Sequence, residues 1–150
     1  MRTADPGVRL GVDVGSVRVG VAISDRTGQL ASPLVTLPRA GSVDALAALV
    51  SEHGVVEVVV GLPQSLSGRP GPAEAAARGF AADLAARLRP VPVCFCDERF
   101  TTVLASRSLT RQGVPARRQR AVVDQAAAVV ILQSWLDTDG GRRGRKAGDA

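Results

Sequence analysis

The first forty residues alternate short runs of apolar, β-branched residues with polar turns, a pattern that predicts strands. Two such runs, "LGVDV" and "VRVGVAIS", meet near Gly15 and Ser16, which is typical of a hairpin. A third run, "LASPLVTL", contains Pro33, a residue that favours the edge of a sheet. The strands expected from these runs span residues 9–14, 18–24 and 30–37.

The rest of the chain alternates expected helices with strands. Apolar residues at positions 46, 49 and 50 follow Ser42, which is expected to cap a helix. A stretch rich in Gly and Pro, residues 61–72, predicts an exposed loop. Strands are expected in "VVEVVVGLP" and "VPVCFC", and helices at about 42–53, 73–88, 102–110 (capped by Thr101 or Thr102) and 119–137.

This order of elements predicts an α/β fold with a mixed five-stranded sheet flanked by helices. The first three strands give an antiparallel start, and the later strand–helix–strand crossover adds parallel pairing. The length of 150 residues suits one domain. We expect a disordered N-terminus over residues 1–8, one domain over 9–137, and a basic, Gly-rich, flexible tail over 138–150.

Composition favours a polyanionic partner. The formal net charge is +5, and Lys146 is the only lysine, so arginines carry almost all of the positive charge. The planar guanidinium group matches the geometry of phosphate. Three Phe, one Trp and no Tyr disfavour a surface that stacks nucleic-acid bases on aromatic rings.

The sequence also bears on the cellular compartment of the protein. No N-terminal signal peptide and no run of about 18 apolar residues is visible, so we expect a cytoplasmic protein without membrane contact. The two cysteines, Cys94 and Cys96, are too few for a disulfide framework and are expected to be buried thiols. No His or Cys lies at the spacing of a zinc site.

Acidic residues interrupt the apolar pattern at two predicted strands. Asp13 lies inside the first strand, on the face opposite Val12 and Val14. Asp97 and Glu98 follow "VPVCFC", at the strand end where α/β sheets carry functional residues. Because adjacent strand residues point to opposite faces, we expect only one of this pair to enter a given site.

Asp124 lies on the apolar face of the last predicted helix, in line with Ala128, Ile131 and Trp135. A partly desolvated carboxylate needs a partner, and a metal ion can supply one. Converging carboxylates suit Mg²⁺ or Mn²⁺, and a pair of such ions can bind both the attacking and the leaving oxygen of a phosphodiester. The ordinary alternatives are hairpin hydrogen bonds for Asp13, a turn for Asp97 and helix capping for Asp124.

Four segments of the chain, in order, resemble the YqgF/RuvX family of RNase H-like nucleases. They cover roughly residues 9–137 and read "LGVDVGSVRVGVAISD", "VVVGLPQSLSGRPGPAEAAARGFAADL", "DERFTTVLA" and "VVDQAAAVVILQSWLD". The resemblance implies an RNase H-like fold and a metal-dependent endonuclease. Members of the family are described as nucleases for the 5′ end of pre-16S rRNA and as Holliday-junction resolvase-like, and both substrates stay open here.

The same resemblance implies that Asp13, Glu98 and Asp124 are the catalytic residues and ligands of Mg²⁺ or Mn²⁺. Asp97 is a further candidate ligand. Eight arginines are candidates for contacts with nucleic-acid phosphates, the alternative being a solvated basic surface: Arg18, Arg69, Arg99, Arg107, Arg111, Arg117, Arg118 and Arg120. Symmetric cutting of a junction needs two active sites, so a resolvase is expected to be a homodimer.

Two other functions compete with the nuclease. Actin-like ATPases and sugar kinases also bind phosphate with an Asp-x-Gly hairpin, but they need a second such hairpin and a longer chain. The other "DGG", residues 139–141, follows no predicted strand, and no GxxxxGK[ST] motif occurs. The second alternative is a non-catalytic RNA-binding or assembly factor of the same fold, against which the complete acidic set argues.

Overall fold

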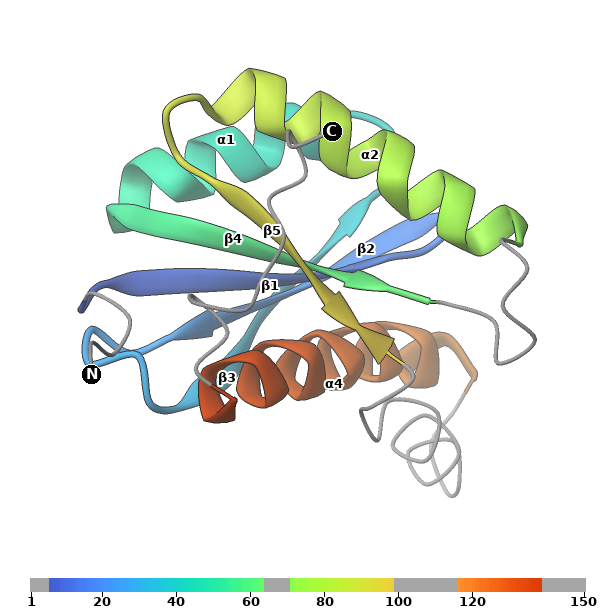
Figure 1. The fold of residues 1–150 in the computed structure, drawn as a ribbon. Helices are drawn as coiled ribbons and strands as arrows, with labels where there is room; N and C mark the ends of the chain where they lie inside the picture. Colours follow the sequence, from blue (N-terminus) through green and yellow to red (C-terminus); the bar gives the residue numbers. More distant parts are fainter. Residues whose placement is uncertain (1–5, 64–70, 99–115, 139–150) are drawn as a thin grey trace.

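The computed structural model describes residues 6–63, 71–98 and 116–138, and within the last range it describes side chains from residue 124 onward. The described elements form one five-stranded sheet with α1 and α2 on one face and α4 on the other (Figure 1). In chain order they are β1 (Val8–Val14), β2 (Arg18–Ser24), β3 (Ala31–Pro38), α1 (Ser42–His53), β4 (Val55–Leu62), α2 (Pro72–Leu88), β5 (Val93–Asp97) and α4 (Ala116–Asp137).

The sheet has the strand order β3-β2-β1-β4-β5. β2 pairs antiparallel with both β1 and β3, whereas β4 pairs parallel with β1 and with β5. Parallel neighbours need a crossover connection, which α1 and α2 provide before and after β4. The prediction of a mixed five-stranded sheet is therefore confirmed, and Pro33 lies in an edge strand, as expected.

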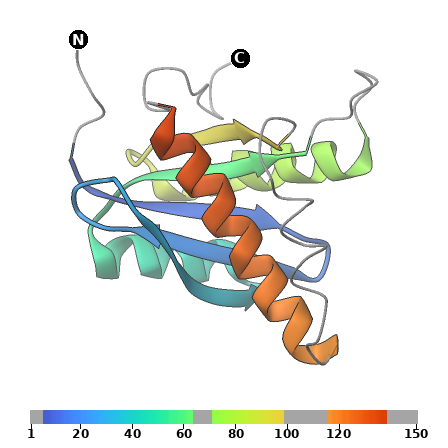
Figure 2. The same cartoon turned by 90° about the horizontal axis from the view of Figure 1, so that it is seen from below.

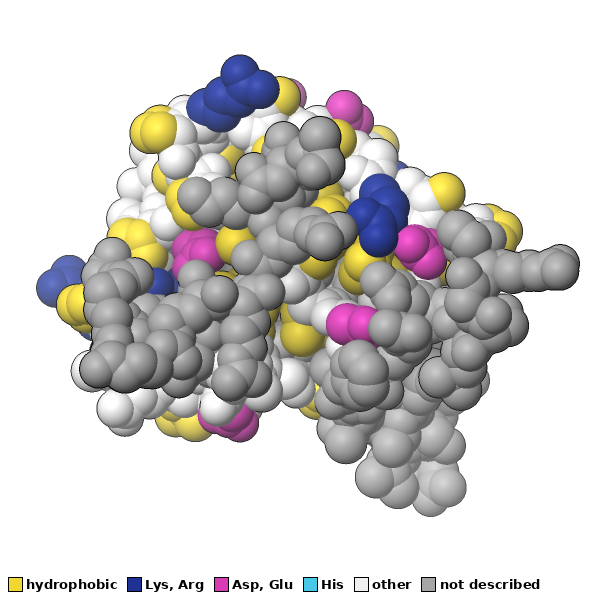
Figure 3. All heavy atoms as spheres, viewed as in Figure 1, with side chains coloured by type: hydrophobic (Ala, Val, Ile, Leu, Met, Phe, Trp, Pro, Cys, Tyr) yellow, Lys and Arg dark blue, Asp and Glu magenta, His cyan; other side chains and the backbone are white. Residues whose placement is uncertain are grey.

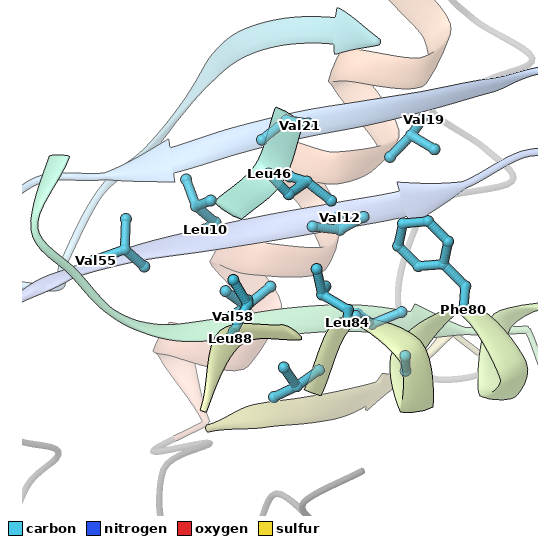
Figure 4. Close-up of a cluster of buried hydrophobic side chains, with 13 residues drawn as sticks. Leu10, Val12, Val19, Val21, Leu46, Val55, Val58, Phe80, Leu84 and Leu88 are labelled. Atoms are coloured by element: carbon cyan, nitrogen blue, oxygen red, sulfur yellow. The ribbon is translucent and has the colours of Figure 1, made fainter. Parts of the chain in front are cut away.

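The larger part of the hydrophobic core lies between the sheet and the helices α1 and α2. Figure 4 shows Leu10 and Val12 of β1 facing Leu46 of α1 and the α2 residues Phe80 and Leu84. All of these side chains are buried. Because side chains alternate along a strand, Gly11 and Asp13 of β1 face α4 instead.

α4 runs diagonally across the opposite face of the sheet (Figure 2). The helix lies close to the strands because Gly11, Gly20 and Gly61 have no side chains on this face. A Cβ atom placed on Gly11, for example, would lie 2.6 Å from Cβ of Leu132. Trp135 is buried in the cluster under α4 and is part of the core.

The ends of several elements differ from the sequence-based expectation. Ser42 does not cap α1: Gly41 precedes the helix in a left-handed conformation with φ 77°, and the Ser42 hydroxyl donates to the Arg39 carbonyl instead. The expected loop over 61–72 begins later, because Gly61 and Leu62 continue β4.

The terminal boundaries also shift. Val8, expected to be disordered, begins β1 and pairs with Val55. α4 begins at Ala116 rather than near residue 119. Residues 64–70 of the expected loop, the expected helix over 102–110 with Thr101 and Thr102, and residues 139–150 of the tail lie outside the described residues. Within the described ranges, none of the helices combines the length and apolar character needed to cross a membrane.

Candidate active site

Asp13 lies near the end of β1, on the face of the sheet that α4 covers. It is directly opposite Gly20 of β2 in the antiparallel register, and only 3% of the residue is exposed. Its neighbour Val12 points into the core on the other face. A buried carboxylate must be compensated by hydrogen bonds, a cation or protonation.

Glu98 directly follows β5 and reaches the same face of the sheet. A Cβ atom placed on Gly61 of β4 would lie 2.8 Å from Oε2 of Glu98 and would also overlap Ile131 of α4. The Glu98 carboxylate therefore lies over Gly61, beside α4. Asp97 follows Phe95 by two residues, so backbone alternation directs Asp97 to the face of α1 and α2.

Asp124 approaches the site from α4. Its Oδ2 atom accepts a hydrogen bond from Nε of Arg18 in β2 at 3.1 Å, and the two side chains are 18% and 33% exposed, respectively. The partner that a partly desolvated Asp124 was expected to need is thus present as an arginine. Gly20 of β2 also lies against Asp124, since a Cβ atom placed on Gly20 would lie 2.9 Å from Cβ of Asp124.

Two glycines place the three carboxylates around one end of the α4 face. Gly20 is opposite Asp13 and touches Asp124, whereas Gly61 underlies Glu98. Gly61 follows Val60, which pairs with Val12 of β1, so Gly61 is also next to the position of Asp13. β1, the residue after β5 and α4 therefore carry Asp13, Glu98 and Asp124 toward one end of the α4 face.

The donors of this site suit a hard divalent cation, because all three are carboxylates and Asp13 is deeply buried. As the side chains of the described residues lie, no three His, Cys, Asp or Glu groups are close enough together to hold an ion. The ion pair with Arg18 accounts for the orientation of Asp124. By their chemistry the three carboxylates fit Mg²⁺ or Mn²⁺, whereas in this arrangement Asp124 is paired with Arg18.

Cys96 is next to the acidic residues. It is in register with Gly61 on the α4 face, and burial, reinforced by the negative charges of Glu98 and Asp97, raises the pKa of its thiol to about 11. Cys96 is thus a neutral thiol at physiological pH. Cys94, expected to be a buried apolar thiol, is buried but has a polar partner, because its Sγ donates to Oε2 of Glu57 at 3.0 Å.

The turn between β1 and β2 is held by an arginine that the sequence analysis missed. Arg39 donates from Nη1 to the Gly15 carbonyl at 2.8 Å, and its guanidinium group lies 5.1 Å from the centre of the Phe80 ring. Gly15 in turn donates its N–H to the Arg18 carbonyl. Arg39 directly follows β3, and the β2–β3 pairing brings it to the turn.

The described residues include only part of the predicted phosphate-binding set. Arg18 lies at the site, and acidic side chains reach the surface on the side of the molecule where β5 ends (Figure 3). Three members lie in the first turns of α4, where side chains are not described, and the remaining four lie outside the described residues. The former are Arg117, Arg118 and Arg120, and the latter are Arg69, Arg99, Arg107 and Arg111.

The architecture is that of an RNase H-like protein. The solved structure of T. thermophilus RuvC in complex with a Holliday junction substrate has a TM-score of 0.55 and 16% sequence identity, over 93% of this chain and 99% of that chain. A second Thermus thermophilus RuvC structure gives a TM-score of 0.52 at 15% identity, with the same coverage. This likeness concerns the fold.

Sequence comparison gives the family. The chain belongs to the RuvX family of Holliday junction resolvases, whose model matches residues 7–138. A protein of Mycolicibacterium paratuberculosis (strain ATCC BAA-968 / K-10) is 56% identical over 97% of this chain and 89% of its own length. One from Mycobacterium sp. (strain KMS) is 58% identical over 89% of this chain and 82% of its own length. Both carry the name "Putative pre-16S rRNA nuclease".

Proposed function

We propose that this protein is an endonuclease that hydrolyses nucleic-acid phosphodiesters with Mg²⁺ or Mn²⁺ held by Asp13, Glu98 and Asp124. The observation that carries the proposal is the burial of Asp13 beside two glycines, one against Asp124 and the other beneath Glu98. Three carboxylates at one end of a sheet repel one another unless a cation lies between them. A divalent ion held among Asp13, Glu98 and Asp124 would offset this repulsion, which supports metal binding as their role.

The chemistry of such a site divides between the ion and the chain. A bound divalent ion would acidify a water molecule and stabilise the attacking and leaving oxygens of the phosphodiester. The chain supplies the rigid arrangement: β1 holds Asp13 and the end of β5 holds Glu98, whereas Asp124 can turn between partners. Arginines at the start of α4 and in the β1–β2 hairpin supply positive charge for the substrate phosphates.

We propose the 5′ region of pre-16S rRNA as the substrate. Relatives that are 56% and 58% identical carry pre-16S rRNA in their names, whereas the T. thermophilus RuvC complex with a Holliday junction substrate is only 16% identical. An rRNA precursor would also place the protein in the cytoplasm. Branched DNA is the second candidate, because the family description names Holliday junctions. Symmetric cutting of a junction would require a homodimer.

The decisive experiment compares the purified protein with the variant Asp13→Asn on two substrates, a pre-16S rRNA 5′ leader and a four-way DNA junction. Each is incubated with Mg²⁺, Mn²⁺ or EDTA. We expect the wild type to cut the leader with either metal and not with EDTA, and Asp13→Asn to be inactive. Asp44→Asn is the matched control, because it makes the same chemical change on an exposed side chain of α1, across the sheet from the site.

Each other outcome favours a different conclusion. Cutting of the junction in preference to the leader would support the resolvase. No cutting of either substrate with either metal would favour the non-catalytic assembly factor. Equal cutting by the wild type and Asp13→Asn would show that the activity does not come from this site.

A further inference from the structure

We propose that Arg18 and the divalent ion compete for the carboxylate of Asp124, so that metal binding releases Arg18 toward a substrate phosphate. The inference rests on the proposed function and adds a positioning residue to it. In this scheme Arg18 occupies the carboxylate of Asp124 until an ion replaces it. Metal loading and substrate binding are thereby coupled through one side chain.

The contact itself is specific. Arg18 and Asp124 are 106 residues apart in sequence, and Nε of Arg18 lies 3.1 Å from Oδ2 of Asp124. With exposures of 33% and 18%, both side chains are partly shielded from solvent. Shielding strengthens an ion pair relative to an exposed one. The arginine therefore holds Asp124 in a definite orientation.

Other contacts hold the two backbones in place, so only side chains need to move. Gly20, two residues from Arg18 on the same strand face, lies against the backbone of Asp124. Gln125 donates from Nε2 to the Thr36 hydroxyl of β3 at 2.9 Å. α4 therefore keeps its position over β2 and β3 when the ion pair opens.

The two partners of Asp124 exclude each other. A carboxylate that gives its lone pairs to a divalent ion has fewer left for a guanidinium group, and the two cations repel at such short distance. The described carboxylates do not form a group able to hold an ion while Asp124 faces Arg18. Once released, Arg18 keeps its positive charge and its planar set of donors, which suit a phosphate.

The test measures Mn²⁺ binding by isothermal titration calorimetry in the wild type, in Arg18→Gln and in Arg87→Gln. Arg87→Gln is the matched control, because it removes the same charge from an exposed pair with Asp44. Without its competitor, Asp124 should bind the ion more readily. We expect Arg18→Gln to lower the Kd for Mn²⁺ about three- to tenfold, and Arg87→Gln to leave it within about twofold of the wild type.

A double-mutant cycle separates competition from the general effect of a nearby charge. In Asp124→Asn we expect weaker Mn²⁺ binding that the addition of Arg18→Gln no longer improves. If Arg18→Gln still strengthens Mn²⁺ binding in the Asp124→Asn variant, the effect comes only from removing a nearby positive charge, and the inference is overturned. Thermal unfolding gives an independent readout: Mn²⁺ should raise the Tm of Arg18→Gln by more than it raises the Tm of the wild type.

The failure of this inference differs from the failure of the proposed function. Equal or weaker Mn²⁺ binding by Arg18→Gln, with clear binding by the wild type, would refute the competition and leave the metal site standing. Absence of Mn²⁺ binding by the wild type would refute the metal site, and the competition with it.

Discussion

Gly20 of β2 lies directly against the backbone of Asp124 in α4, so that any side chain at position 20 would overlap the Asp124 carbonyl group. This contact connects the strand opposite Asp13 with the helix that carries the third carboxylate. It makes the glycine a determinant of the site as well as of packing.

The variant Gly20→Ala is therefore expected to destabilise the protein by about 1–3 kcal/mol, the usual cost of inserting a methyl group into a packed interface. Urea denaturation at equilibrium measures this loss. Gly79→Ala is the control: Gly79 lies in α2 with no atom near the added methyl group, and should gain about 0.5–1 kcal/mol. Equal effects of the two variants would contradict the close contact of α4 with β2.

The buried pair of Arg9 and Glu57 should be the most sensitive polar contact away from the site. Nε of Arg9 lies 3.0 Å from Oε1 of Glu57, and their side chains are 5% and 11% exposed. Arg9→Met leaves the Glu57 charge without its arginine, which should cost about 3–5 kcal/mol in the free energy of unfolding. In the same urea experiment the exposed Arg87→Gln should lose at most about 1 kcal/mol. A similar small loss for Arg9→Met would show that burial adds nothing to this pair.

The arginines at the start of α4 should determine the salt dependence of nucleic-acid binding. Contact with about four duplex phosphates predicts a slope of log affinity against log salt near −3.6, by about −0.9 for each phosphate. Replacing Arg117, Arg118 and Arg120 together by Gln should bring the slope to about −0.9. Fluorescence anisotropy with a labelled RNA duplex in EDTA measures both slopes.

The control for this experiment makes the same change of charge at the other end of the sheet. It replaces Arg26, Arg87 and Arg89, which are all exposed, by Gln. We expect this triple variant to keep a slope near −3.6. A wild-type slope near zero would show that these arginines do not contact nucleic-acid phosphates.

Cys96 should react with iodoacetamide only at high pH, because the thiolate is the reactive form and burial raises the pKa of this thiol to about 11 from 9.0. Mass spectrometry of the native protein across a pH series measures the reaction at each cysteine. Labelling of Cys96 that is half-maximal near pH 9 would contradict its burial beside Glu98 and Asp97.

The raised pKa of Cys96 also makes the stability of the fold depend on pH. Between pH 9 and pH 11 the unfolded chain releases the Cys96 proton whereas the folded chain keeps it. The contribution of Cys96 to stability is therefore complete below pH 9 and is lost as the pH rises through this window. Cys96→Ala should show a smaller alkaline loss of stability than the wild type.

Much of the fold could be predicted from local pattern. Alternation in β1 separates Leu10 and Val12, which face the larger core, from Asp13, which faces α4, and this arrangement follows from strand geometry alone. The cap of α1 could not be predicted in this way. Ser42 is a good capping residue by type, but the left-handed Gly41 before it sets a different helix entry.

The sequence by itself determined the order of the elements, the mixed sheet and the acidic positions Asp13, Glu98 and Asp124, because these follow from periodicity, turn residues and the family's motifs. Only the tertiary structure decided that Asp124 faces Arg18, that the Glu98 carboxylate lies over Gly61 beside Ile131, and that Arg39 supports the β1–β2 turn. The physical reason is that these contacts join residues far apart in sequence. The contacts of Asp124 and Glu98 also depend on how closely α4 packs against glycines of three strands, which no local propensity encodes.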